Sequence, residues 1–189
     1  MRRTLIVMLK APRPGLVKTR LGRDIGMVAA ARWFRHQSLS LLRRLRDPRW
    51  QIVLAVSPKN DAAGHSVWPV DLPRIPQGTG DLGMRMARAL RSGPAGPVCL
   101  IGADIPDVRS LHLARAFAAL GRHQAVFGPA KDGGFWLVGL KHPARSPRGM
   151  FNGVRWSTEH ALADSLLTLP DYSIALADRM QDVDTVADL

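Results

Sequence analysis

Apolar runs and stretches of helical periodicity alternate along this chain. Continuous apolar runs predict buried strands at residues 4–9, 51–56, 98–101, 125–128, 135–140 and 174–176. Apolar residues spaced by three or four predict helices at residues 24–45, 81–91, 111–120 and 157–167, the last with Ser157 or Thr158 as its N-cap. Strands that alternate with helices are typical of an α/β protein, so we expect a mostly parallel sheet with helices on both faces.

Length and cysteine content restrict the class of protein. A chain of 189 residues suits one domain, which we predict over residues 1–189. The chain has a single cysteine, Cys99, which excludes a disulfide framework and a cysteine metal site. Cys99 lies in an apolar run. The first apolar run, residues 5–9, is too short for a signal peptide or a membrane span. The sequence therefore predicts a cytoplasmic protein with no membrane span.

The formal net charge of +12 raises the question of a nucleic-acid partner. The 27 basic residues are spread along the chain, however, and only 6% of the residues are aromatic. Scattered arginines are typical of solvated helix faces, and base stacking needs aromatic side chains. We therefore expect no nucleic-acid partner.

The loop after the first predicted strand concentrates positive charge. Its four cations are Lys10, Arg13, Lys18 and Arg20. Ligands of open α/β sheets lie beyond the carboxyl ends of the strands, and Gly15 would let the backbone come close to a phosphate. The segment is not a P-loop, because that motif has glycine directly before its lysine, whereas Val17 precedes Lys18. The loop predicts a phosphate site, with a nucleotide as the first candidate.

Acidic residues follow a predicted strand, lie in a glycine-rich loop, or form a pair near the C-terminal end of the sequence. The residues concerned are Asp104, Asp132, Asp182 and Asp184. A magnesium ion that holds phosphate oxygens needs only one or two carboxylates, and Asp104, directly after the run at 98–101, is placed to supply one. The alternatives are a helix cap for Asp104 and a tight turn for Asp132, because Asp-Gly is a common turn pair.

Residues 78–83 read Gly-Thr-Gly-Asp-Leu-Gly, which matches the dinucleotide fingerprint G-x-G-x-x-G. Asp104 follows Gly83 after 21 residues, close to the spacing of the acidic residue in that fingerprint. Two features oppose NAD binding: residues 71–77 contain two prolines and make a poor central strand, and Asp81 would lie beside the pyrophosphate. An NAD-dependent dehydrogenase is kept as an alternative.

Six short motifs occur in a fixed order along the chain. They are Lys10-x-Pro-x-Pro-Gly-x-Val-Lys-Thr-Arg-Leu21, Gly80-Asp-Leu-Gly-x-Arg-Met86, Gly102-Ala-Asp-Ile-Pro106, Gly128-Pro-Ala-x-Asp-Gly-Gly-Phe135, Trp156-Ser-Thr158 and Asp182-Val-Asp-Thr185. With these motifs the chain resembles a bacterial family of GT-A type transferases, the domain-of-unknown-function 2064 family, which is related to nucleotidyltransferases such as 2-phospholactate guanylyltransferase. The resemblance covers nearly the whole chain. It implies a single-domain, Rossmann-like GT-A fold, the fold of the nucleotide-diphospho-sugar transferases.

The resemblance also implies roles for particular residues. Those expected at the triphosphate are Lys18 and Arg20, with Lys10, Arg13 and Gly15 beside them. Those expected near the base and ribose are Gln77, Gly78 and Asp81. Those expected at the acceptor are Asp132, Gly133, Gly134 and Trp156. Asp104 and Asp184 are the expected ligands of Mg²⁺ or Mn²⁺, and Lys18, Arg20 and Asp104 are the expected catalytic residues.

The predicted function is that of a metal-dependent transferase that uses a nucleotide. Nucleotidyl transfer from a nucleoside triphosphate to a phosphorylated small-molecule acceptor is favoured, because four cations suit a triphosphate. Glycosyl transfer from a nucleotide sugar needs fewer cations and is the first alternative, and a nucleotide-binding module without turnover is another. Phe135 and Trp136 stand where the family usually has a tyrosine pair, and Ala103 where it often has serine, so the acceptor contacts are expected to differ.

Overall fold

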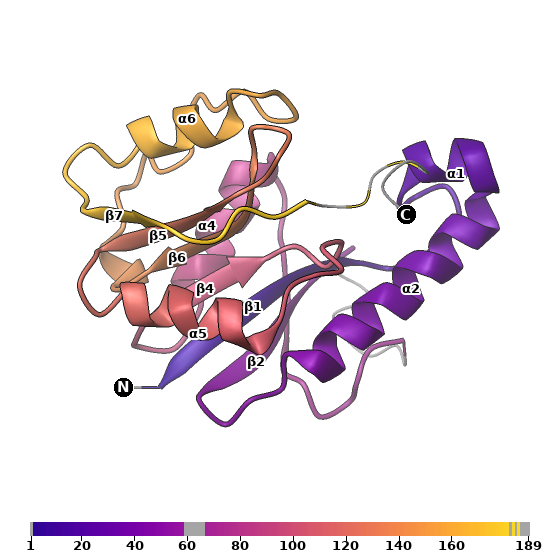
Figure 1. Cartoon of the computed structure of the whole chain (residues 1–189), viewed down its shortest axis with the longest axis horizontal. Helices are drawn as coiled ribbons and strands as arrows, with labels where there is room; N and C mark the ends of the chain where they lie inside the picture. Colours follow the sequence, from indigo (N-terminus) through magenta and orange to yellow (C-terminus); the bar gives the residue numbers. More distant parts are fainter. Residues whose placement is uncertain (1, 59–66, 182, 184, 186–189) are drawn as a thin grey trace.

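A seven-stranded sheet forms the centre of the protein, whose computed structural model describes residues 2–58, 67–181, 183 and 185. The strand order is β3-β2-β1-β4-β6-β5-β7 (Figure 1). The strands are β1 (Arg3–Lys10), β2 (Trp50–Ser57), β3 (Arg74–Pro76), β4 (Val98–Ile101), β5 (Ala125–Pro129), β6 (Phe135–Leu140) and β7 (Ile174–Leu176). Strand β6 runs antiparallel to β4 and β5, and the other pairings are parallel. The prediction of a mostly parallel sheet is confirmed.

Helices cover both faces of the sheet (Figure 1). They are α1 (Thr19–Ile25), α2 (Met27–Arg44), α4 (Leu82–Arg91), α5 (Ser110–Ala119) and α6 (Ala161–Leu167), with a short 3₁₀ helix at Pro143–Arg145. Leu5 and Val7 of β1 pack in one core with α2 and α5, whereas Ile6 between them packs in a second core with α4 and α6. This alternation buries both faces of β1, which explains its continuous apolar run. None of the helices that the structure describes is long and apolar enough to cross a membrane.

Two helices differ from the sequence prediction. The helix expected from residue 24 is two helices, because Gly26 has a φ of 89°, which a right-handed helix cannot contain. Helix α6 begins at Ala161 instead of residue 157, because Thr158 is engaged in the turn before it. The Oγ1 of Thr158 donates to the carbonyl oxygen of Arg155 and accepts from the N–H of His160.

Strand β3 was not predicted, since Pro73 and Pro76 flank a run of only two other residues. It lies at the edge of the sheet and pairs only with β2 in the described structure. An edge strand tolerates proline because one of its sides makes no ladder hydrogen bonds. Tertiary pairing therefore created a strand where the local sequence favours a loop.

Three strand ends meet at one edge of the sheet. Val7 of β1 pairs with Ile101 of β4, so these parallel strands end side by side. Ile101 also pairs with Leu137 of β6, which runs in the opposite direction and therefore begins at the same edge. The loops that carry Lys18, Asp104 and Asp132 start or end here.

Candidate functional site

A cleft with two adjoining parts opens at this edge. The first part has a volume of about 570 Å³ and lies among the end of β1, the start of α1 and the first turns of α4. The second has a volume of about 490 Å³ and is lined by the β5–β6 hairpin and by residues before α6. Their common wall consists of Arg20, Leu82, Met86, Gly102, Asp104, Phe135, Trp136, Trp156 and Ser157. Ligands bound in the two parts would therefore be neighbours, which suits a reaction between two substrates.

Lys18 and Asp104 form an ion pair in the wall of the first part. Lys18 Nζ lies 2.8 Å from Asp104 Oδ2, and the two side chains are 7% and 31% exposed. Lys18 precedes α1 with a left-handed backbone, φ 45° and ψ 47°, a conformation that costs a non-glycine residue about 1 kcal/mol. The structure thus brings together two predicted catalytic residues that are 86 positions apart in the sequence.

Arg44, at the end of α2, fixes the loop that carries Asp104. Its Nη2 donates to the carbonyl oxygen of Pro106 at 2.7 Å and its Nε to that of Val108 at 3.0 Å. Burial, and next the nearby Arg109, lower the pKa of the Arg44 guanidinium. An arginine stays charged in proteins, so these hydrogen bonds are charge-assisted and hold the loop firmly.

Asp104 also contacts the C-terminal segment. The N–H of Val183 donates to the carbonyl oxygen of Asp104 at 3.1 Å. Asp182 and Asp184 flank Val183 in the sequence, but both lie outside the described residues, so the predicted second metal ligand is not placed. Within the described part of the chain, no group of three or more His, Cys, Asp or Glu residues could hold a metal ion.

The oxygen donor at Asp104 fits a hard divalent cation. A Cβ at Gly102 would lie only 2.8 Å from Asp104 Oδ1, so a larger residue at position 102 would displace this oxygen. Magnesium keeps several waters and takes further ligands from substrate phosphates, so a single carboxylate is a sufficient protein anchor. Asp104 is thus the described residue that could hold Mg²⁺ or Mn²⁺.

The predicted cations divide between the cleft and its surroundings. Lys10 and Lys18 line the first part, and the exposed Arg20 lines both parts. Arg13 and Gly15, in the same loop, are exposed and do not line either part. Three of the four cations of this loop are therefore brought to one cavity.

The glycine-rich segment before α4 is used mainly to start that helix. Asp81 is its N-cap, with Oδ1 accepting from the N–H of Met84 at 2.8 Å. A Cβ at Gly78 would overlap the Arg88 guanidinium, and neither Gly78 nor Asp81 lines the cleft. Gln77 does line the first part, and it is buried.

Sequence reasoning missed Arg85 as a cleft residue. Arg85 lies on α4, lines the first part of the cleft, and donates from Nη1 to Oε1 of Gln77 at 3.1 Å. Its position one helical turn after Asp81 was the available signal, because residues four apart share one face of a helix. Arg85 adds a fourth cation to the first part of the cleft.

The β5–β6 hairpin shapes the second part. Asp132 and Gly134 line it, and Asp132 Oδ1 accepts from the N–H of Gly134 at 2.9 Å, which makes Asp132 a turn residue as well. Gly133, between them, has a φ of +87°, and a Cβ there would overlap the carbonyl oxygen of Glu159. The Gly133 carbonyl accepts from the N–H of Leu162 at 3.0 Å. The hairpin therefore packs directly on the backbone before α6.

We expect Gly133→Ala to lower the free energy of unfolding by about 2–4 kcal/mol, because a side chain there meets backbone and the left-handed conformation is strained. Thermal unfolding measures the loss, at about 2–4 °C per kcal/mol for a chain of this size. Gly153→Ala is the matched control: its φ is +74° but nothing lies within 4 Å of the added Cβ, so it should cost only about 1 kcal/mol. Equal losses in the two variants would contradict the close packing at Gly133.

Aromatic side chains form the apolar side of the common wall. The Trp156 ring lies 6.2 Å from that of Phe135 and 5.8 Å from that of Phe151, measured between centroids, both edge to face. Phe135 in turn meets the Phe127 ring edge to face at 5.1 Å. This cluster holds Trp156, the predicted acceptor residue, between the two parts of the cleft.

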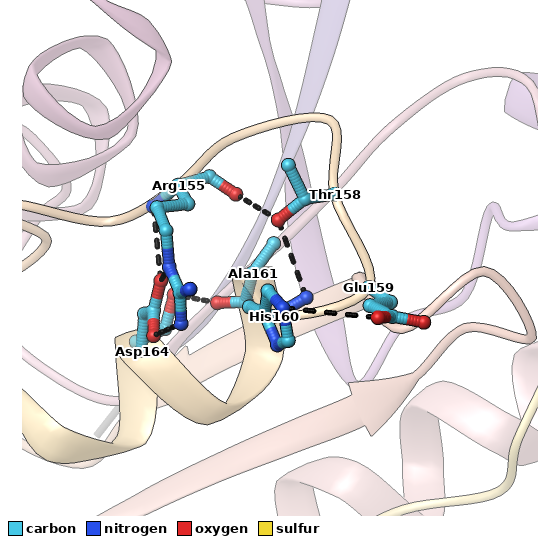
Figure 2. A network of polar contacts seen from close by, with 7 residues as sticks. Arg155, Thr158, Glu159, His160, Ala161 and Asp164 are labelled. Carbon is cyan, nitrogen blue, oxygen red and sulfur yellow. Dashed lines mark hydrogen bonds and ion pairs between the residues drawn. The ribbon is translucent and has the colours of Figure 1, made fainter.

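A polar network fixes the segment that follows Trp156 (Figure 2). Arg155 donates from Nε and Nη2 to the two carboxylate oxygens of Asp164, each at 2.9 Å. These hydrogen bonds lower the pKa of Asp164 to about 2. Thr158, which lines the second part, donates to the carbonyl oxygen of Arg155 at 2.7 Å. Through Arg155, the segment that forms this wall of the cleft is anchored to Asp164 of α6.

Solved structures identify the fold family of the chain. A putative nucleotide-diphospho-sugar transferase from Desulfovibrio desulfuricans G20 is 29% identical, with a TM-score of 0.87 over 100% of this chain and 85% of that one. The 4-diphosphocytidyl-2C-methyl-D-erythritol synthase of Anaerococcus prevotii DSM 20548 shares 9% identity and a TM-score of 0.63 over 99% and 94% of the two chains. Rv0371c of Mycobacterium tuberculosis H37Rv, solved in complex with manganese, shares 17% identity and a TM-score of 0.53 over 100% and 96%. The chain has the GT-A-like fold of the nucleotide-diphospho-sugar transferases.

The family follows from the sequence. A model of the family described as "Uncharacterized protein conserved in bacteria (DUF2064)" matches residues 41–158, and the chain belongs to this family. A comparison with proteins of curated function finds no match. The predicted family and fold are both confirmed.

Proposed function

We propose that the protein transfers the nucleotidyl group of a nucleoside triphosphate to a small-molecule acceptor, with a divalent cation at Asp104. The nucleotide would occupy the first part of the cleft and the acceptor the second. Asp184 is the proposed second ligand of the cation.

One observation carries the proposal: four cations from two segments of the chain, residues 10–20 and helix α4, line the first part of the cleft. They are Lys10, Lys18, Arg20 and Arg85. A triphosphate carries close to four negative charges at neutral pH, and oriented cations in a partly enclosed cleft bind phosphate oxygens strongly. Asp104 adds the carboxylate that a magnesium–triphosphate complex requires.

In the proposed reaction a phosphate oxygen of the acceptor, which has no proton to lose, attacks the α-phosphorus of the triphosphate. The bond from this phosphorus to the oxygen that bridges to the β-phosphate breaks, and pyrophosphate leaves. A bound cation would supply charge neutralisation at the phosphates. Lys18 and Arg20 would stabilise negative charge on the departing pyrophosphate, while Lys10 orients the triphosphate. Trp156 and Asp132 would hold the acceptor in the second part.

The apolar wall between the two parts favours glycosyl transfer as a second candidate. Leu82, Met86, Phe135 and Trp156 line both parts. Aromatic and aliphatic faces pack well against a sugar ring, and a nucleotide sugar would place its sugar at this boundary. The NAD-dependent alternative has less support, because the glycine-rich segment follows a three-residue edge strand and Asp81 caps the helix after it.

A thermal-shift panel tests the proposal. Nucleoside triphosphates, nucleotide sugars and NADH are each added with manganese and without it. A ligand at a hundred times its Kd stabilises a protein by about 2.7 kcal/mol, and we expect this for a triphosphate with manganese. Stabilisation by NADH alone would reject the proposal.

Turnover assays distinguish nucleotidyl transfer, glycosyl transfer and binding without turnover. The donor that stabilises the protein is incubated with a panel of sugar phosphates and unphosphorylated sugars. Nucleotidyl transfer from a triphosphate releases pyrophosphate, whereas glycosyl transfer from a nucleotide sugar releases a nucleotide. Pyrophosphate release with sugar phosphates only would support the phosphorylated acceptor. Tight binding with no product in any combination would indicate a binding module.

A further inference from the structure

Gln77 occupies a buried position where three strands end. It is 3% exposed, and its Nε2 donates to the carbonyl oxygens of Leu9 at 3.0 Å and Ala55 at 2.9 Å. Its backbone N–H donates to the carbonyl oxygen of Val56 at 3.1 Å. Because an amide nitrogen carries two hydrogens, these bonds use both side-chain donors and fix the orientation of the amide.

The carbonyl of the same amide faces Arg85. Arg85 Nη1 donates to Gln77 Oε1 at 3.1 Å, and its Nε donates to the carbonyl oxygen of Asp81 at 3.3 Å. A guanidinium has five N–H donors in a planar fork, so these two bonds orient the group without using all its donors. Arg85 lines the same part of the cleft as Lys10 and Lys18.

We infer that Gln77 is a positioning residue that directs the Arg85 guanidinium toward the phosphate groups of the nucleotide, an inference that rests on the proposed function. The side chain of Gln77 has no N–H left to donate to a phosphate oxygen, and its Oε1 can only accept, so its effect on phosphate binding passes through Arg85. Phosphate is the partner that matches a planar fork in a cavity lined by three other cations, because a guanidinium can bind two phosphate oxygens at once.

Calorimetric titration with two probes tests the role of Arg85: the four common nucleoside triphosphates with manganese, and inorganic tripolyphosphate. Arg85→Gln should lower the affinity for the tightest-binding triphosphate and for tripolyphosphate about 10- to 100-fold, which corresponds to the loss of one charge-assisted hydrogen bond. Arg85→Lys should recover part of the loss. Arg91→Gln is the matched control, since Arg91 lies on the same helix, donates to Ser146 Oγ and to the carbonyl oxygen of Pro147, and does not line the cleft. It should leave both affinities unchanged.

A double-mutant cycle tests the role of Gln77. Gln77→Met should weaken tripolyphosphate, whereas Gln77→Met with Arg85→Gln should bind it no more weakly than Arg85→Gln alone. Gln77→Asn, shorter by one methylene, serves the same cycle if the Met variant does not fold. Losses that add in the cycle would overturn the positioning role, because a merely structural defect acts independently of Arg85.

The remaining outcomes are distinct. Tripolyphosphate binding that is unchanged by Arg85→Gln, while the unmodified protein binds nucleotides, overturns this inference alone. If Arg85→Gln weakens binding of the corresponding nucleoside, which has no phosphates, as much as it weakens binding of the triphosphate, Arg85 contacts the base. That result would also overturn the inference. An unmodified protein that binds neither nucleotides nor tripolyphosphate overturns the proposed function and this inference together.

Discussion

Lys18→Met should lower kcat/KM for the proposed transfer by about 10²–10³, the usual effect of removing one preorganised donor at developing charge. Lys18 is the most enclosed of the loop cations, with a side chain only 7% exposed, and little water would compensate for its loss. The same change leaves the half-buried Asp104 carboxylate without this partner, so we also expect the free energy of unfolding to fall by about 1–3 kcal/mol. Steady-state kinetics and thermal unfolding measure the two effects.

Arg115→Met is the matched control for Lys18. Arg115 Nη1 lies 3.3 Å from Asp178 Oδ2, and the side chains of this pair are 60% and 44% exposed. Exposed pairs contribute at most about 1 kcal/mol, and this one lies outside the cleft lining. Turnover by the Lys18 variant at the level of the Arg115 variant would remove Lys18 from the catalytic machinery.

Asp104→Asn should remove the manganese-dependent part of the stabilisation by a triphosphate and reduce turnover at least about a hundredfold. The amide has nearly the shape of the carboxylate but no charge, so it binds a hard cation far more weakly. A catalytic cation supplies several kcal/mol of charge stabilisation, which sets the size of the kinetic effect. The measurement is a manganese titration of the melting temperature at a fixed nucleotide concentration.

Asp178→Asn is the control for Asp104, since it removes one exposed carboxylate that does not itself line the cleft. Its manganese response should equal that of the unmodified protein. If Asp104→Asn responds to manganese in the same way, the cation is held elsewhere, and Asp104 is left as the partner of Lys18 alone.

Local sequence determined much of the fold because both faces of the central strands are buried. A strand covered on both sides is a continuous apolar run, which is how residues 98–101 and 135–140 were predicted with the bounds that β4 and β6 have. The same reasoning failed at β3, where pairing at the sheet edge outweighs two prolines. It failed again at Gly26, because a glycine alone does not indicate whether its φ will be positive.

The candidate site was predictable where a motif names a residue type at a strand end. Lys18, Arg20 and Asp104 were found in this way, and all three line the cleft. Arg85 was not found, because its role depends on the orientation of a helix against the sheet. Gln77 was predicted to contact the nucleotide, and only its hydrogen bonds to Leu9 and Ala55 indicate a role through Arg85.

The sequence by itself determined the family, the alternation of strands and helices, and the loops that carry charge. Only the tertiary structure decided which charges meet: Lys18 lies against Asp104, which is 86 positions away, and Arg13 lies outside the cleft. The physical reason is that residue type and periodicity are local properties of the chain, whereas an ion pair or a shared cavity depends on strand order. In this sheet β4 lies beside β1 and the antiparallel β6 beside β4, and that order brings the loop after β1, the loop after β4 and the β5–β6 hairpin to a single edge.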